Sequence, residues 1–306
     1  MSSSMVLNRR IFLANSLAAA AAAPCVCLGD DGKGGRSFKL DKQVGVTTSS
    51  LSGHLVAKPG KGQFSLLELP RILRDELDMR VIDLNTSSLA SEEPSYLDRC
   101  RAAAEKEGCV FTNLKLNQRD VNMNSPDKTV REKALNVYKR SIDAAARLGC
   151  RWARPLPSRE RPDMKIHVAS YRELADYAAS RDVQMLVENF GWMDSDPNSV
   201  PKLVEAIDRK VAVSPDTGNW SNNEVRYAGL AKAFPLAVTC DFKARALGPD
   251  GEHKLYDLKK CFEIGWQAGF CGPWCLEHAN RDRKSLFREL ALLRDMLRKW
   301  MAAQRG

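Results

Sequence analysis

The chain has 306 residues and an ordinary globular composition, with 44% hydrophobic and 28% charged residues. This length fits one large domain, and no apolar run in its body approaches the roughly 20 residues needed to cross a bilayer. The net charge of +9 invites a nucleic-acid interpretation, but +5 of it falls in residues 281–306. There the basic side chains accompany an apolar stripe at helical spacing, which indicates the solvated face of a packed helix. We therefore expect no nucleic-acid partner.

Residues 1–36 have the features of an export signal followed by a linker. Arg9 and Arg10 precede a moderately apolar stretch and an alanine run, with a cleavage site expected near Ala23. The Arg-Arg-x-Phe-Leu arrangement resembles a twin-arginine signal, which is an address read by a receptor. We expect export through the twin-arginine route, to the periplasm or its equivalent. Residues 37–306 would form the folded domain, with no stable membrane insertion after signal removal.

From residue 43 onward, short β-rich runs alternate with helical stretches. The expected strands are Val44–Thr48, Arg80–Leu84, Cys109–Leu116, Cys150–Leu156, Gln184–Phe190, Val211–Asp216, Leu236–Lys243 and Gly272–Glu277. The expected helices are Leu66–Leu77, Ser95–Lys106, Lys128–Leu148, Ser170–Ser180, Ser199–Asp208, Glu224–Phe234, Leu255–Ala268 and Arg283–Met301. Three of these helices are followed by a glycine suited to a C-terminal cap, namely Gly108, Gly149 and Gly269.

Eight strands, each followed by a helix, predict a single-domain (β/α)8 TIM barrel, a fold of about 250 residues. A doubly wound open sheet is the competing α/β architecture. It usually carries a glycine-rich phosphate loop after the first strand, and Gly45-Val-Thr-Thr-Ser-Ser has no such loop.

Four acidic residues lie where expected strands end: Glu188, Asp216, Asp241 and Glu277. Their separations of 28, 25 and 36 residues are close to the roughly 30 residues of one βα unit. Consecutive barrel strands would therefore bring all four to one mouth. One such acid alone could be a helix N-cap, but four in succession favour a shared metal site. Oxygen ligands suit one divalent ion such as Mn2+ or Mg2+, and Lys243 would offset part of the remaining negative charge.

At these residues the sequence resembles the xylose isomerase-like TIM-barrel superfamily, specifically its sugar phosphate isomerase/epimerase branch. The most specific pieces are Val-Glu188-Asn, Pro-Asp216-Thr-Gly-Asn and Leu-Glu277, with a weaker match at Thr112-Asn113-Leu114-Lys115. The resemblance implies Glu188, Asp216 and Glu277 as metal ligands. Two positions depart from the family pattern: Asp241 replaces a histidine ligand, and Phe190 replaces a histidine after the fifth strand.

The resemblance also implies a reaction, namely proton abstraction next to a carbonyl of a small carbohydrate, with an enediolate intermediate. Glu188 and Glu277 would then be the catalytic acid and base, in an order that the sequence leaves open. Further candidates for substrate contact lie beside Asp216 or in loops expected near the mouth: Asn219, Lys243, Trp192, Trp220, His253 and His54. The two tryptophans would stack on a sugar ring or cover the barrel rim, and the two histidines are equally consistent with ordinary loop residues.

Three alternatives remain at this stage. A polyol dehydratase would use the same metal site, because it also begins by removing an activated proton. A catalytically silent carbohydrate-binding barrel would explain the missing histidines. An abasic-site endonuclease shares the barrel, but its metal cluster is rich in histidine, and this chain has four histidines in total with none at the relevant strand ends.

Overall fold

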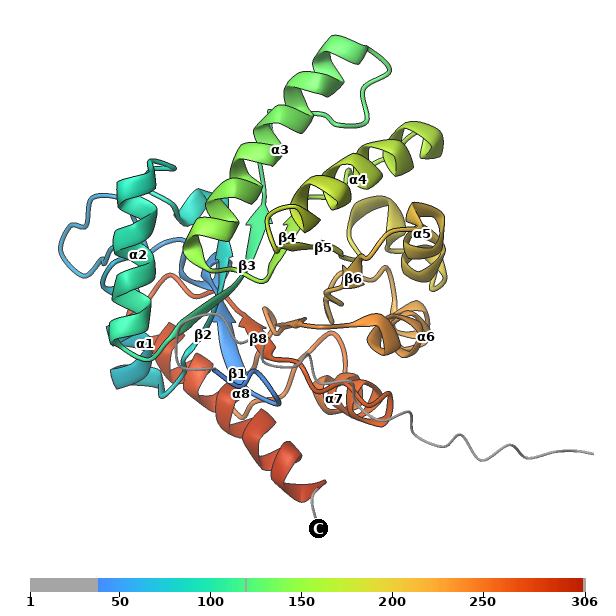
Figure 1. Ribbon diagram of the computed structural model, residues 1–306. Coiled ribbons are helices and arrows are strands. Elements are labelled where there is room, and N and C mark those ends of the chain that lie inside the picture. Colours follow the sequence, from blue (N-terminus) through green and yellow to red (C-terminus); the bar gives the residue numbers. More distant parts are fainter. Residues whose placement is uncertain (1–37, 119, 305–306) are drawn as a thin grey trace, which may run out of the picture.

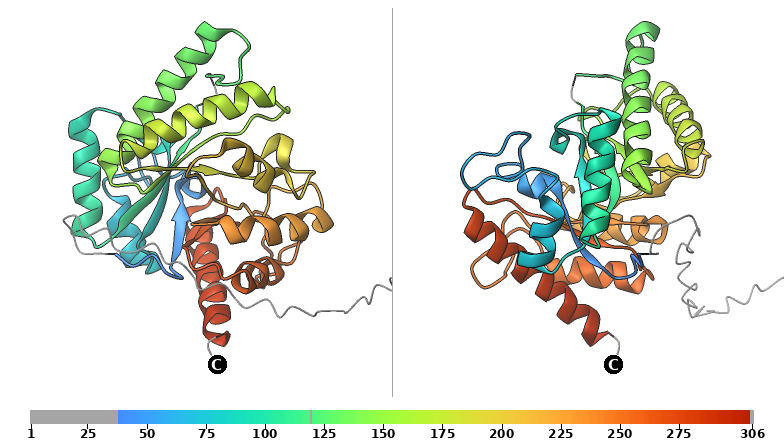
Figure 2. Two further views of the ribbon diagram at one scale, coloured as in Figure 1. Left: turned by 45° about the vertical axis from the view of Figure 1, so that its right-hand side comes forward. Right: turned by 60° about the vertical axis from the view of Figure 1, so that its left-hand side comes forward.

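Eight parallel strands form the inner wall of the molecule, and helices surround them (Figures 1 and 2). The computed structural model describes residues 38–118 and 120–304, so the predicted export segment 1–36 lies outside the described residues. The strands are β1 Val44–Thr47, β2 Val81–Asn85, β3 Val110–Leu116, β4 Trp152–Pro155, β5 Gln184–Val187, β6 Ala212–Val213, β7 Cys240–Lys243 and β8 Trp274–Glu277.

The strand order is β6-β5-β4-β3-β2-β1-β8-β7, and all the pairings are parallel. The two ends of this sheet, β6 and β7, meet through isolated parallel bridges that join Val213 to Ala237 and Asp216 to Asp241. The wall is thereby continued around the molecule. This confirms the predicted single-domain TIM barrel.

The α-helices are α1 Leu69–Leu77, α2 Pro94–Lys106, α3 Lys128–Leu148, α4 Met164–Ala179, α5 Ser199–Ile207, α6 Asn223–Ala233, α7 Leu258–Gln267 and α8 Arg283–Ala303. Short 3-10 turns follow four of the strands or helices: η1 Thr48–Leu51, η2 Thr86–Ser88, η3 Gly191–Met193 and η4 Phe234–Leu236. Within the described residues, no helix combines the length and apolar character that a membrane crossing requires.

Several of the expected boundaries were wrong by three or more residues, among them the end of β5 (Val187, not Phe190) and the start of β7 (Cys240, not Leu236). Two further cases have a visible cause or bear on the site. Helix α4 begins at Met164 and not at Ser170, because the Asp163 side chain accepts hydrogen bonds from the first free backbone amides and caps the helix there. Strand β6 is confined to Ala212–Val213, so Asp216 lies beyond it, in the segment that leads toward α6. These differences concern the ends of elements, where local hydrogen bonds decide which residue begins or ends a helix or strand and the hydrophobic pattern does not.

The barrel interior has an apolar floor with a polar layer above it. Residues Val81, Trp152, Leu186, Ala212 and Cys275 form a small buried cluster with Leu40, separate from the main core between sheet and helices. Because side chains alternate along a strand, the residues two positions further on face the same way. Those residues are all polar: Asp83, Arg154, Glu188, Ser214 and Glu277. The strands therefore close off the barrel at one end and present charged groups at the other.

Trp274 links β8 to the helical layer, and its replacement tests the outer core. Its fully buried ring lies within 6 Å, centroid to centroid, of four phenylalanine rings: Phe234, Phe242, Phe262 and Phe270. We expect Trp274→Ala to lower the free energy of unfolding by about 3–5 kcal/mol, measured by urea titration. Leu255, which is 66% exposed, provides the control: Leu255→Ala should change the value by less than about 0.5 kcal/mol. A small effect at Trp274 would contradict this account of the core.

Candidate active site

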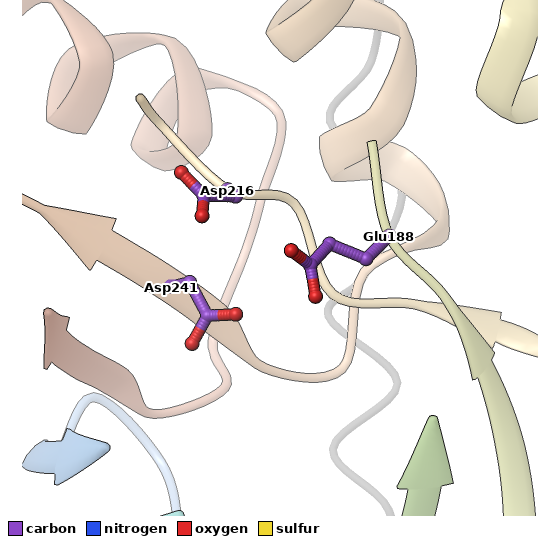
Figure 3. Close-up of side chains that lie close together, drawn as sticks. All are labelled: Glu188, Asp216 and Asp241. Carbon is purple, nitrogen blue, oxygen red and sulfur yellow. The ribbon is translucent and has the colours of Figure 1, made fainter. Parts of the chain in front are cut away.

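Three carboxylates converge at the mouth of the barrel, as Figure 3 shows. Glu188 follows β5, Asp216 follows β6, and Asp241 lies on β7. One oxygen from each lies within 4.8 Å of the others, and all three side chains are buried. We call these residues the carboxylate triad. Three buried negative charges at this spacing repel one another strongly unless cations compensate them.

Asp216 is held in place by the backbone around it. Its Oδ1 accepts hydrogen bonds from the amides of Gly218 (2.7 Å) and Asn219 (3.2 Å). Its own amide donates to the side-chain oxygen of Asn189, whose Nδ2 donates back to the Asp216 carbonyl. These bonds fix the turn after β6 and direct the second carboxylate oxygen into the barrel.

Each member of the triad pairs with a different cation, of which Arg154 and Lys115 are buried and Lys243 is partly buried. Arg154 Nε lies 2.6 Å from Glu188, Lys243 Nζ lies 2.6 Å from Asp216, and Lys115 Nζ lies 2.5 Å from Asp241. Lys243 shares a strand face with Asp241 and reaches the carboxylates as expected. The roles of Lys115 and Arg154 were not predicted from the sequence, although Lys115 ends the Thr112-Asn113-Leu114-Lys115 motif.

Glu277, expected as a fourth ligand, has a different environment. Its carboxylate lies 3.3 Å from Lys243 Nζ and also pairs with Arg245, and it is not part of the carboxylate triad. The structure therefore brings together three of the four predicted ligands and places the fourth on the other side of Lys243. Its ligation of a metal remains a prediction.

A further carboxylate, Asp83 on β2, lies in the barrel interior and was not anticipated. It is fully buried, with Lys115 Nζ 3.5 Å away, and neither of its oxygens has a hydrogen-bond partner among the described residues. The period-2 alternation of β2 could have placed it inward, but nothing local identifies Lys115 as its partner.

Polar side chains extend this charge network around the mouth. Lys115 Nζ donates to Thr47 Oγ1 at 3.0 Å, and Arg154 donates to Asn117 Oδ1 at 3.0 Å. Asn219 connects two of the ion pairs, because its amide donates to Glu188 at 3.0 Å and accepts from Lys243 at 2.6 Å. Asn219, predicted as a substrate contact, thus lies within the site.

The other predicted substrate contacts lie among packed side chains. The Trp220 ring is buried and lies against Gly229 of α6, where an added Cβ would clash with it at 2.3 Å. Trp192, in η3, is partly buried and makes an edge contact with His167. These rings belong to the core or its margin, and their contact with a substrate remains a prediction.

The two histidines are also engaged in local bonds. His54 is buried, with Nε2 3.3 Å from the carbonyl oxygen of Asn280. His253 accepts a hydrogen bond from the Ala246 amide and packs against the Tyr256 ring in a tilted arrangement. Burial lowers the pKa of His253, so it is neutral near pH 7. Neither makes a contact with the carboxylate triad.

Burial shifts the proton affinities of the acidic groups. It raises the pKa of Glu188 to about 7 and that of Asp216 to about 6, with Arg154 and Lys243 opposing the respective shifts. Burial likewise raises the pKa of Asp83 to about 7, and Lys115 opposes it. Glu277 differs: although burial opposes ionisation, Lys243, Lys115 and Arg245 hold its pKa below the ordinary value. Acids with separated pKa values in one site are typical of proton-transfer centres.

The carboxylate triad has the chemistry of a hard-cation site. All its ligand atoms are oxygens, as Mg2+ and Mn2+ prefer. Moreover, Asp241 Oδ2 is buried and has no hydrogen-bond partner among the described residues. A dication would bind this oxygen and would reduce the repulsion among the three buried carboxylates. The residues present therefore fit a single bound divalent ion.

A family model described as xylose isomerase-like TIM barrel matches residues 76–302. The chain belongs to this family. No curated protein matches it. The membership agrees with the resemblance found at Glu188, Asp216 and Glu277.

Solved structures share the fold of this xylose isomerase-like barrel at low identity. D-psicose 3-epimerase from Clostridium cellulolyticum H10, solved with D-tagatose, has a TM-score of 0.70 at 16% identity and covers 84% of this chain and 98% of its own. A xylose isomerase-like protein from Mycobacterium smegmatis, solved with magnesium, has a TM-score of 0.60 at 17% identity, covering 84% and 97%. The probable 3-DHS dehydratase AsbF from Bacillus anthracis has a TM-score of 0.61 at 12% identity, covering 82% and 98%.

The raised pKa values predict how pH affects this xylose isomerase-like barrel. In the folded protein the pKa of Glu188 is about 7 and that of Asp216 is about 6, both above the ordinary values of these side chains. The folded state therefore binds these protons more tightly than the unfolded state, and the metal-free protein loses stability as the pH rises from the ordinary values through pH 6 to 7. A dication competes with the same protons, so the rise in melting temperature on adding Mn2+ should be larger at about pH 7.5 than at about pH 5.5. Differential scanning fluorimetry with EDTA or Mn2+ checks this. An equal rise at both pH values would contradict it.

Proposed function

We propose that the chain is a divalent-metal-dependent sugar isomerase or epimerase that removes a proton next to a carbonyl, with an enediolate intermediate. The observation that carries this proposal is the buried carboxylate triad at the C-terminal ends of adjacent strands of a xylose isomerase-like barrel. In such barrels this end holds the active site. Structural neighbours support the substrate class, because one epimerase was solved with D-tagatose and another with D-fructose.

Glu188, Asp216 and Asp241 would hold the metal, with Glu277 as a candidate fourth ligand. Bound Mn2+ or Mg2+ would supply Lewis acidity that stabilises negative charge on oxygens next to the reacting carbon. Glu188 and Glu277 are proposed as the two proton-transfer groups. Glu188 follows β5 and Glu277 ends β8, with β6 and β7 between these strands in the chain, so the two side chains come from different sides of the barrel mouth. Epimerisation requires this arrangement, since one group removes a proton from one face and another returns it to the opposite face.

The surrounding cations position these acids. Arg154 holds Glu188 through a contact at 2.6 Å, and Asn219 holds its other oxygen at 3.0 Å. Lys243 lies between Asp216 and Glu277, with contacts at 2.6 and 3.3 Å. Its ammonium group can orient a substrate hydroxyl or carbonyl while it bridges the two carboxylates and offsets their mutual repulsion. We therefore propose Lys243 and Asn219 as substrate-binding residues.

Replacing one ligand of the triad tests the proposed metal. Asp216→Asn keeps the size of the side chain but removes a charged oxygen donor, so the melting-temperature rise on adding Mn2+ should disappear. Turnover of ketohexoses and aldohexoses should fall at least 100-fold, as measured by chromatography of the sugar products. The exposed Asp143, which pairs with Arg181, provides the control, since Asp143→Asn should leave both measurements unchanged.

The same assay separates the proposal from its rivals. A dehydratase would release water and give an unsaturated or deoxy product in place of an isomer. A carbohydrate-binding barrel without catalysis would bind Mn2+ or sugar but yield no product. A wild-type protein that ignores Mn2+ and Mg2+ in melting experiments would contradict the metal-dependent enzyme altogether.

We also propose that residues 1–36 direct export by the twin-arginine route, on the basis of the Arg9-Arg10 pair and the alanine run. Fusing this segment to a folded reporter in a bacterium with that pathway should place the reporter in the periplasm. Changing both arginines to lysine should retain the charge but stop export, as shown by fractionation. Export of the double-lysine fusion at the original level would contradict the proposal.

A further inference from the structure

We propose that Lys115 is a built-in counter-cation of the carboxylate triad, which keeps the barrel mouth stable without a dication and weakens the binding of one. The inference rests on the proposed metal centre, because the weakening concerns that ion. It assigns a role to a residue that the proposed reaction does not use.

Lys115 is placed where it must interact with carboxylates. It is the next-to-last residue of β3, its side chain faces the barrel interior, and it is 2% exposed. Its Nζ lies 2.5 Å from Asp241 Oδ1, 3.0 Å from Thr47 Oγ1 and 3.5 Å from Asp83 Oδ2. An ammonium group so fully removed from water is stable only when nearby negative charges replace its hydration.

The contact between Lys115 and Asp241 joins distant parts of the barrel. Lys115 belongs to β3 and Asp241 to β7, and these strands are not neighbours in the sheet. Arg154 pairs with Glu188 and Lys243 pairs with Asp216, so with Lys115 each triad carboxylate has its own cation. When all three carboxylates are ionised, the triad and its three cations therefore carry no net charge before any dication arrives.

A dication changes this balance, because it needs the oxygens that the cations already contact. If a dication binds Asp241, Lys115 can lose its contact with Asp241 and still have a carboxylate partner. That partner is Asp83, whose two oxygens have no hydrogen bonds among the described residues. The positive charge of Lys115 nevertheless stays close to the metal and repels it. Lys115 should thus stabilise the metal-free protein while it lowers metal affinity.

Lys115→Met tests these two opposite effects. The variant keeps an unbranched side chain but removes the charge. Without metal, its melting temperature should fall, because Asp83 and Asp241 lose their shared cation. Its affinity for Mn2+, measured by isothermal titration calorimetry or by electron paramagnetic resonance of free Mn2+, should rise at least tenfold. A residue with a merely structural role would lower stability and weaken Mn2+ binding together.

Lys139→Met is the matched control, because Lys139 carries the same charge but pairs with Glu173 near the surface of α3. It should leave both the melting temperature and the Mn2+ affinity close to wild type. If Lys115→Met fails to fold without metal, the double variant Asp83→Asn with Lys115→Met removes one carboxylate together with its cation. This variant should fold and should still bind Mn2+ more tightly than the wild type.

The outcomes distinguish this inference from the proposed function. Tighter Mn2+ binding by either Lys115 variant supports it, including the case in which the wild type itself binds too weakly to measure. If the wild type binds Mn2+ and the Lys115 variants bind no more tightly, the role of Lys115 is wrong and the metal centre stands. If neither the wild type nor the variants bind Mn2+, both proposals fail.

Discussion

The rest of the barrel mouth depends on the pairing of buried carboxylates with buried cations. A carboxylate removed from water loses hydration worth several kcal/mol, and it remains ionised only where charges or hydrogen-bond donors replace that water. Here the replacements come from other strands: Arg154 on β4 serves Glu188 after β5, and Lys115 on β3 serves Asp241 on β7. These charges match only if the strands keep their register. The closed sheet fixes that register, and the apolar floor beneath it excludes water from one side.

The sequence predicts the scaffold well because the scaffold is built from local repeats. Eight β-rich runs, each followed by a helical stretch, define the barrel, and the glycines after α2, α3 and α7 adopt the left-handed backbone of a helix cap. The spacing of Glu188, Asp216 and Asp241 by about one βα unit is sufficient to place them at one end of adjacent strands. Their convergence within 4.8 Å agrees with that argument.

The partners of those acids could not be predicted, because they are selected by geometry across the barrel. Strand alternation places Lys115, Arg154 and Asp83 inward, but which cation reaches which carboxylate depends on strand tilt and on the way β6 meets β7. Likewise, chain position puts Trp220 and His54 in loops near the mouth, while packing directs the Trp220 ring onto Gly229 and His54 toward Asn280. Long-range contacts determine these side-chain directions and ion-pair partners, so no short sequence motif predicts them.

The two lysines of the site have the same kind of environment, because each contacts one triad carboxylate and one carboxylate outside the triad. Lys115 lies between Asp241 and Asp83, and Lys243 lies between Asp216 and Glu277. If a dication takes the triad oxygens, each lysine keeps a negative partner, so neither ammonium group is left without a carboxylate. This matters because an uncompensated buried ion costs several kcal/mol, more than the loss of one contact. The outer carboxylates therefore allow a site that is charge-balanced without metal to accept one with small side-chain movements and without unfolding.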